Sequence, residues 1–187
     1  MKSILLKTLF LLFFAVSKNI YSQNLTAADK TMENTNVQLI NKFYTCFKNR
    51  DYKGMQDCYA DTAVFSDEVF VNLNSKQVKA MWEMLVTGGK DTKLDFKNVT
   101  ASGTRGDAEW TAYYTFSATG RKVVNNVKGN FIIENGKIIK HTDVFSFYKW
   151  SKQALGISGA LLGWTPFLKK KVRKFAMSRL SDFQAKK

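Results

Sequence analysis

Several residue types are scarce in this chain of 187 residues: it has one proline, two cysteines and one histidine. A structural zinc site needs four ligands, usually cysteine or histidine, so no zinc site is expected. Scarce proline and only eleven glycines argue against a fibrous or disordered chain. The sequence also has no glycine-rich phosphate loop, because Gly88 and Gly89 follow a helical pattern instead of preceding one. We therefore expect a globular protein with no cofactor. Its expected strands also lack the interleaved aromatic and basic residues of a single-strand binder, so no nucleic-acid partner is expected.

Long apolar runs are absent too, and the longest candidate lies at the N-terminus. Lys2 and Lys7 precede the apolar stretch 9–16, and Ser22 stands at a suitable position for cleavage before Gln23. This order is typical of a secretory signal peptide over residues 1–22. A membrane anchor is the alternative, but a span needs about 20 apolar residues. We expect an exported protein, either periplasmic or secreted.

Export affects how the two cysteines are interpreted, because disulfides persist in oxidising compartments. Cys46 and Cys58 fall on what the pattern predicts as consecutive helices, so a disulfide between them is one alternative. Two buried thiols that act as small apolar side chains are the other. The sequence leaves both open.

Acidic residues are outnumbered by basic ones, 15 to 29, and the excess lies mostly near the C-terminus. From Lys149 onward there are ten basic residues and one acidic residue, Asp182. The preceding part of the predicted mature chain, residues 23–148, carries a net charge of only +2. The basic character therefore belongs to the tail.

The body of the chain shows helical spacing first. Residues 23–35 are polar and are predicted as a linker, with a helix starting after Asn34, Thr35 or Asn36. A second short helix is expected around Tyr52–Tyr59, followed by a short apolar strand. A third helix is expected to start at Ser75 as its cap and to end at Gly88 and Gly89.

The period then changes from 3.6 to 2, which indicates strands. Strands are expected over 92–101, 107–116, 122–134 and 137–149, with Asn135-Gly136 as a strong hairpin signal. Short turns between these strands predict an antiparallel meander. The fold class is therefore α+β, with N-terminal helices packed on a curved antiparallel sheet, and the domain is expected to span residues 36–150.

Two stretches carry a resemblance to a known family. "FYTCFKNRDYKGMQDCYADTAVFSDEVF" and the later "GKIIKHTDVFSF" resemble the SnoaL-like branch of the nuclear transport factor 2-like superfamily. The resemblance implies a cone-shaped domain with an apolar pocket between sheet and helices, and often a homodimer formed through the sheet. It does not imply one activity, because a fold can host many functions.

The resemblance also implies roles for single residues. In relatives resembling ketosteroid isomerase, a base that shuttles a proton falls on Asp67, and an oxyanion-binding tyrosine falls near Phe43, with Tyr44 one residue away. The second oxyanion donor falls near Gly129, which has no side chain. In relatives resembling limonene-epoxide hydrolase, the aspartate that activates water falls on Asp143. The partner arginine and aspartate of that site are missing, so both chemistries are only partly equipped.

The spacing of His141 and Asp143 places them on one face of a strand, together with Ile139, Phe145 and Phe147. Facing an apolar interior, the two form a candidate acid/base pair. A hydrogen-bonded structural pair is an equal alternative. Asp67 has two interpretations as well, because a carboxylate after a short strand can cap a turn instead of lining a pocket.

We hypothesise that Asp67, His141 and Asp143 are the catalytic candidates and share one cavity with aromatic ligand-binding residues. Those residues are Phe43, Tyr44, Trp82, Trp110, Tyr114 and Phe145. Packing in the core is the alternative for Trp82 and Trp110. Binding of a small apolar or amphipathic molecule is the favoured function. The alternatives are an isomerase, cyclase or epoxide-hydrolase-type enzyme, and an envelope-associated protein that acts through its tail.

The tail, residues 151–187, combines an apolar segment with a basic amphipathic helix. Thr165 as cap and Pro166 in the first turn predict the start of this helix. Its basic residues could contact an anionic membrane surface or a partner: Lys169, Lys170, Lys171, Arg173 and Lys174. Alternatively, the apolar stripe of the helix covers the mouth of the cone and the lysines are only solvated.

Overall fold

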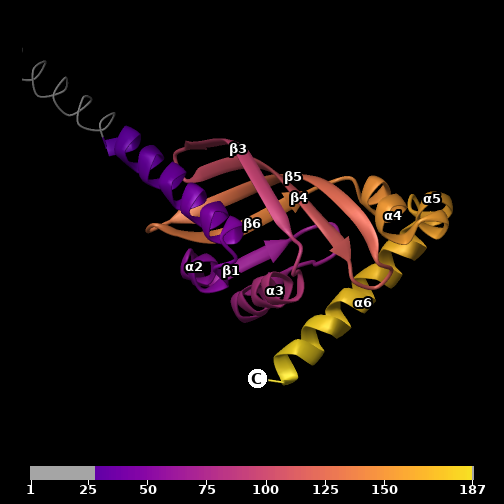
Figure 1. The fold of residues 1–187 in the computed structure, drawn as a ribbon. Coiled ribbons are helices and arrows are strands. Elements are labelled where there is room, and N and C mark those ends of the chain that lie inside the picture. Colours follow the sequence, from indigo (N-terminus) through magenta and orange to yellow (C-terminus); the bar gives the residue numbers. More distant parts are fainter. Residues whose placement is uncertain (1–27, 187) are drawn as a thin grey trace, which may run out of the picture.

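The computed structural model describes residues 28–186, in which a curved six-stranded sheet is covered by helices on one face (Figure 1). The predicted signal peptide lies outside the described residues. A helix over residues 28–48 comes first. The remaining elements are α2 (Tyr52–Asp57), β1 (Tyr59–Ser66), β2 (Leu73–Asn74), α3 (Ser75–Gly88), β3 (Lys93–Ser102), β4 (Arg105–Phe116), β5 (Arg121–Glu134), β6 (Lys137–Val144), α4 (Phe147–Leu155), α5 (Ile157–Leu162) and α6 (Pro166–Ala185). The α+β class is confirmed.

The strand order in the sheet is β2-β1-β6-β5-β4-β3. The four strands β3 to β6 form the expected antiparallel meander, and Asn135-Gly136 turns the chain between β5 and β6 with positive φ at both residues. The short strand β1 adds to this meander by pairing parallel with β6, and β2 pairs with β1. The sheet is therefore mixed, and the last strand of the meander lies in its interior.

Several expected boundaries are wrong. Residues 28–35, predicted as a linker, are already helical. Asn74, not Ser75, caps α3, and it forms a capping box with Gln77. The predicted strand 137–149 ends at Val144, because the Ser146 side chain accepts a hydrogen bond from the Lys149 backbone and starts α4 at Phe147.

A bulge in β6 changes which residues face inward. Ile133 of β5 pairs with Ile138, whereas Ile132 pairs with Lys140, so one extra residue is accommodated in β6. Ile138 is consequently fully buried, and the expected inward position of Ile139 is wrong. Beyond the bulge the expected alternation holds, and His141 and Asp143 both face the core.

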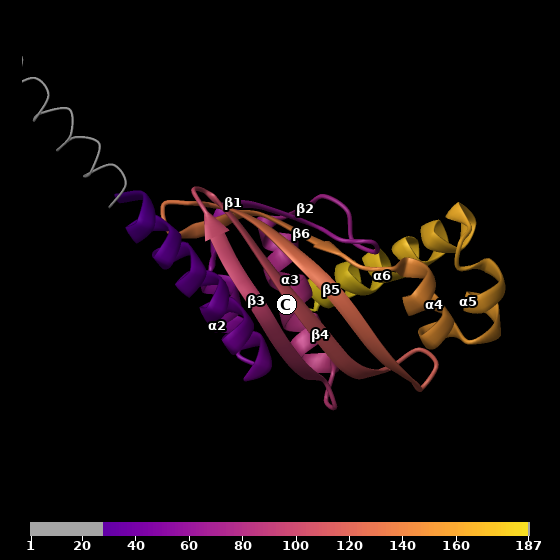
Figure 2. The same ribbon diagram turned by 90° about the horizontal axis from the view of Figure 1, so that it is seen from above.

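The main core lies between the concave face of the sheet and the helices, as Figure 2 shows for the helix over 28–48 and for α3. Phe43 is at its centre, with edge-on ring contacts to Tyr59, Trp82 and Phe131. These rings come from three strands or helices besides that of Phe43, so they hold the helices on the sheet.

The C-terminal helices α4 and α5 lie at the end of the molecule opposite the helix over 28–48 (Figure 1). Thr165 caps α6 and Pro166 is in its first turn, as predicted. From there α6 runs back to pack against α3, and its Leu180 is fully buried in the main core. Lys169 forms an ion pair with Glu68, and the Arg173 side chain donates to the Glu68 carbonyl. None of the helices within residues 28–186 is both long and apolar enough to span a membrane.

Candidate functional site

A cavity of about 380 Å³ opens between the concave face of the sheet, α3 and α6. Its size is typical of sites for small organic molecules. Four of the expected aromatic residues line it, namely Trp82, Trp110, Tyr114 and Phe145. Two carboxylates, Asp67 and Asp143, also line it. A mainly apolar cavity with two convergent acids is the candidate functional site.

Asp143 belongs to a series of buried hydrogen bonds that runs from Trp110 to Trp82. Its Oδ1 atom accepts from Trp110 Nε1 at 3.2 Å and lies 3.0 Å from His141 Nε2. The other nitrogen of His141, Nδ1, lies 2.7 Å from the Tyr59 hydroxyl, which in turn accepts from Trp82 Nε1 at 2.9 Å. Five side chains on β1, α3, β4 and β6 are thereby connected.

The groups in this series that can only donate limit where its protons lie. Both indole N–H groups can only donate, so Tyr59 Oη and Asp143 Oδ1 each accept one bond. If Tyr59 then donates its own proton to His141 Nδ1, the Nε2–H of His141 donates to Asp143. This arrangement gives every donor an acceptor and places a proton on His141 Nε2.

His141 itself does not reach the cavity. Its side chain is fully buried, and Phe131 stacks on its ring with centroids 4.2 Å apart. The hypothesis that His141 lines the cavity is therefore wrong, while Asp143 does line it. Within the described part of the chain, no hydrogen bond reaches Asp143 Oδ2. His141 thus acts as a positioning residue that orients Asp143, and Oδ2 is the oxygen left for a ligand.

Asp67 fits both of the interpretations that its sequence context allows. Its Oδ1 atom accepts from the backbone N–H groups of Val69 and Phe70 and so caps the turn after β1. The same side chain lines the cavity. Burial raises the pKa of Asp67 to about 7; the backbone N–H donors of Phe70 and Val69 lower it, and the charges of Asp143 and Glu68 raise it. Asp67 can therefore gain or lose a proton near neutral pH.

Tyr114 adds a second polar group to the cavity wall. Its hydroxyl accepts a hydrogen bond from Trp150 Nε1 at 2.8 Å. Trp150 is on α4, so this bond holds the Tyr114 ring against that helix. Burial raises the pKa of Tyr114 to about 12, the Trp150 hydrogen bond lowers it, and the Asp67 charge raises it. Tyr114 therefore remains a neutral hydroxyl that can donate to a ligand.

Phe43 and Tyr44 do not line the cavity, although both were expected there. Both side chains are fully buried in the core, because the helix over 28–48 turns them onto Phe131 and Phe96. The Tyr44 hydroxyl lies over Gly129 and has no hydrogen-bond partner among the described residues. The two residues support the wall of the cavity from behind.

The sequence analysis missed part of the site. Tyr59 was interpreted as helical, so its place beside His141 was not seen. Val172, Phe175, Ala176 and Arg179 of α6 line the cavity, which agrees with the alternative that the apolar stripe of this helix covers the mouth of the cone; the individual residues were not expected in the site. That stripe was the available signal, because it requires a surface to cover.

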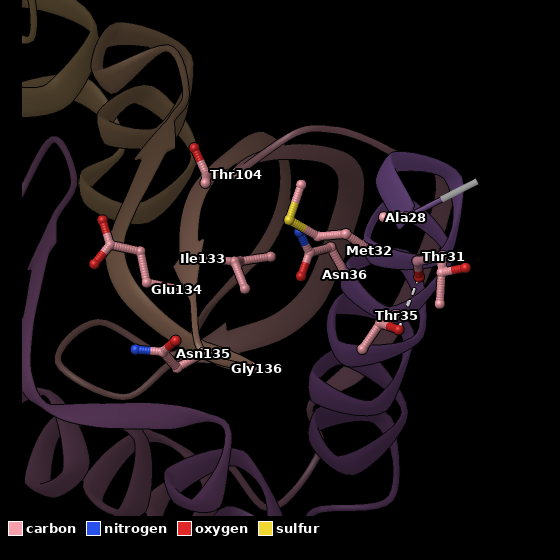
Figure 3. A pocket seen from close by; sticks show the side chains of 10 residues that line it. All are labelled: Ala28, Thr31, Met32, Thr35, Asn36, Thr104, Ile133, Glu134, Asn135 and Gly136. Carbon is pink, nitrogen blue, oxygen red and sulfur yellow. Dashed lines mark hydrogen bonds between the residues drawn. The ribbon is translucent and has the colours of Figure 1, made fainter. Parts of the chain in front are cut away.

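A second, wider hollow of about 720 Å³ lies between the first helix and the β5–β6 turn (Figure 3). Its walls contain Met32 and Ile133, and Glu134 is the one charged residue among those that line it. Its lining has no aromatic ring and no buried acid, so it lacks the aromatic walls and the convergent carboxylates of the first cavity.

Metal chemistry has no support in the described residues. No group of three or more histidine, cysteine, aspartate or glutamate side chains between residues 28 and 186 could hold a metal ion. Cys46 and Cys58 are free thiols. Burial raises the pKa of Cys58 to about 11, so this thiol stays protonated and behaves as an apolar side chain.

Comparison with known proteins identifies similar chains. Residues 40–141 match the family described as the SnoaL-like domain. An LEH-like epoxide hydrolase of M. tuberculosis is 18% identical with a TM-score of 0.55, over 70% of this chain and 97% of the other.

TerC, crystallised with polyporic acid, is 15% identical with a TM-score of 0.56, over 65% and 99% of the two chains. A protein assigned as a SnoaL-like polyketide cyclase from Jannaschia sp. CCS1 is 12% identical with a TM-score of 0.58, over 66% and 94%. None of the curated proteins searched matches this chain. At these identities the structural likeness establishes the fold.

Proposed function

Because this chain belongs to the SnoaL-like domain family, we propose that it binds a small apolar or amphipathic molecule in the cavity between sheet, α3 and α6. The observation that supports this most directly is the cavity itself. Aromatic side chains supply apolar contact area, and Asp67, Asp143 and Tyr114 supply polar groups that fix orientation. TerC, which shares the fold, was crystallised with polyporic acid, an organic molecule.

Native mass spectrometry of the purified chain tests this proposal. A small molecule that co-purifies in stoichiometric amount supports it and identifies the ligand class. The neutral fluorophore 1-N-phenylnaphthylamine serves as a probe if the cavity is empty. Ala112 lines the cavity, so Ala112→Leu should reduce probe affinity by filling space. Thr111→Leu, on the next residue of β4 and outside the set that lines the cavity, should leave probe affinity unchanged. Equal affinity in both variants would contradict the proposal.

Proton transfer on the bound molecule is a second candidate function, and the pKa of Asp67 favours it. A group with a pKa of about 7 can act as acid and as base at neutral pH. Asp143, oriented by His141 and Trp110, supplies a second carboxylate in the same cavity. Such a pair suits an isomerase or cyclase that moves a proton between two positions of its substrate.

Deuterium uptake distinguishes binding from proton transfer. The ligand found by native mass spectrometry is incubated with the chain in D₂O, and its mass is measured over time. Uptake that Asp67→Asn and Asp143→Asn abolish, while ligand binding persists, establishes acid/base activity. Binding without uptake in the parent chain identifies a binding protein instead.

Export is part of the same proposal. It is supported by Lys2 and Lys7, the apolar stretch 9–16 and the small residue Ser22. Fractionation of an exporting bacterial host and the intact mass of the recovered chain test it. The expected chain begins at Gln23 and is absent from the cytoplasm. Leu11→Arg, which interrupts the apolar stretch, should keep the chain inside the cell.

A further inference from the structure

Five apolar side chains are exposed together where α5 meets α6. We call them the α5–α6 patch; they are between 42% and 80% exposed and comprise Ile157, Leu161, Leu162, Trp164 and Phe167. Single exposed apolar residues are normal on a protein surface, but a cluster that contains two aromatic rings indicates a contact surface.

The local structure holds this patch in a fixed shape. Ile157 and Leu161 are four residues apart on α5 and therefore share one face. Trp164 Nε1 donates to the Leu161 carbonyl at 3.0 Å, which keeps the indole beside the end of α5. Gly159 lets α5 approach α4 closely, since a Cβ there would overlap the Ser151 carbonyl.

The patch projects from the molecule. In Figures 1 and 2 α5 lies at the end of the molecule opposite the helix over 28–48. None of the five patch residues lines the cavity. The patch is therefore a projecting surface, separate from the candidate site.

Lysines of α6 lie along one side of the α5–α6 patch. On α6, Lys170, Lys171 and Lys174 follow Phe167 at intervals of three, four and seven residues, so all four share one exposed stripe. Lys169 and Arg173 are turned away from this stripe and contact Glu68 instead. The sequence from 147 to 181 contains no acidic residue that could neutralise the stripe.

We propose that the α5–α6 patch docks on an anionic lipid surface. Trp164 and Phe167 would enter the interfacial layer of the bilayer, where aromatic side chains are favoured. Lys170, Lys171 and Lys174 would reach the phosphates, with their methylene groups against the apolar region. The helices lie on the surface and do not cross it, as amphipathic interfacial helices do.

A second copy of this chain fits the patch less well than lipid does. A symmetric dimer through this surface would bring the lysine stripes of both copies into one interface, where charges of the same sign are repulsive. An anionic bilayer satisfies the lysines and the aromatic rings together.

Vesicle flotation tests the proposal with the chain recovered from an exporting host. Vesicles of phosphatidylcholine are compared with vesicles that also contain phosphatidylglycerol, at low and high salt. We expect the chain to float with the anionic vesicles and to be released by salt, which screens surface charge. Lys170→Glu with Lys171→Glu should lower the partition coefficient by more than roughly 30-fold, because the loss of two lysines alone accounts for that factor and the glutamates add repulsion. Trp164→Ser with Phe167→Ser should lower it at least about tenfold.

Matched controls separate the patch from general basic charge. Lys53→Glu with Lys93→Glu makes the same change at exposed lysines of α2 and β3, and should leave partitioning within about twofold. The substituted patch residues are exposed, so circular dichroism should show unchanged folding. Acetylation followed by mass spectrometry should show Lys170 and Lys171 protected by anionic vesicles while Lys53 and Lys93 stay reactive.

Three results would overturn the proposal. The first is partitioning of the patch variants equal to that of the parent chain. The second is equal acetylation of Lys170, Lys171, Lys53 and Lys93 on vesicles. The third is a dimer in light scattering that Trp164→Ser with Phe167→Ser dissolves while the parent chain does not float, which would identify the patch as a self-association surface.

Discussion

The hydroxyl of Tyr44 lies over Gly129, in the space that a side chain at position 129 would occupy. The same side chain at position 129 would also approach Asp143 Oδ1, because Gly129 and Asp143 face each other on β5 and β6. A glycine on a strand often marks such a close approach. Tyr44 therefore fills the place next to Asp143 where the resemblance to ketosteroid isomerase relatives located a second oxyanion donor.

Stability measurements on this pair follow from the unpartnered hydroxyl. Tyr44→Phe removes a buried hydroxyl that has no hydrogen-bond partner among residues 28–186, and should raise the free energy of unfolding by about 1 kcal/mol. Gly129→Ala should lower it by about 2 kcal/mol, since the new methyl group overlaps that hydroxyl. Urea denaturation of both single variants and the double variant forms a thermodynamic cycle. We expect the alanine to cost less when residue 44 is phenylalanine, and additive changes would contradict the overlap.

The pKa of Asp67 predicts how stability depends on pH. The folded-state pKa of about 7 lies above the unfolded value, so the native state binds more protons than the unfolded state between about pH 4 and pH 7. Stability should therefore fall as pH rises through this window and level off above it. Asp67→Asn should remove about 4 kcal/mol of this dependence while keeping an oxygen for the Val69 and Phe70 N–H groups.

Denaturation at several pH values checks the Asp67 prediction. Asp107→Asn, at an exposed position on β4, is the matched control and should give a profile parallel to that of the parent chain. A steep loss of stability between pH 4 and pH 7 that persists in Asp67→Asn would assign the effect to another group.

The buried hydrogen-bond chain predicts a difference between stability and binding. Tyr59→Phe leaves Trp82 Nε1 and His141 Nδ1 without their partner and should cost about 2 kcal/mol of unfolding free energy. Neither Tyr59 nor His141 lines the cavity, so affinity for 1-N-phenylnaphthylamine should change little. Thermal denaturation and fluorescence titration of the same variant measure the two effects. A large loss of probe affinity with unchanged stability would place Tyr59 in contact with the ligand.

The contacts of Glu68 with α6 are expected to limit how fast a ligand leaves the cavity. Its carboxylate pairs with Lys169 and its carbonyl accepts from Arg173, so this residue fastens α6 beside the cavity. Glu68→Gln should lower stability by less than about 1 kcal/mol, because the pair is partly exposed. It should nevertheless accelerate probe release and amide hydrogen exchange in α6. Asp61→Asn, which breaks the exposed ion pair with Lys79, is the control and should change neither rate.

Local patterns were enough to predict much of this fold. The alternation in β4 placed Trp110 and Tyr114 on the inner face, and the structure has both there. Asn135-Gly136 predicted the hairpin because positive φ is easiest for these residue types. Thr165 and Pro166 predicted the start of α6 for a similar local reason.

Features that depend on distant residues could not be predicted from local patterns. The bulge in β6 exists only in the pairing with β5, so Ile139 was assigned the inward position of Ile138. Tyr59 continues a helical spacing, but pairing with β6 draws it into β1. Phe43 and Tyr44 carry no local sign that distinguishes a core ring from a ligand-binding ring. His141 was likewise assigned to the cavity, because periodicity fixes the face of a strand and not the depth of a side chain.

The parallel pairing of β1 with β6 has a consequence for how the chain folds. Tyr59 and His141 are 82 positions apart, and their hydrogen bond joins the first strand of the domain to its last. Contacts of such long sequence separation form late and slow the overall folding rate. The hydrogen-bond chain behind Asp143 is therefore completed only when the whole domain has condensed. A nascent chain that has not yet released β6 from the ribosome can have helices, hairpins and the local turn in which Val69 and Phe70 hold Asp67, but it lacks Asp143 and the residue that orients it.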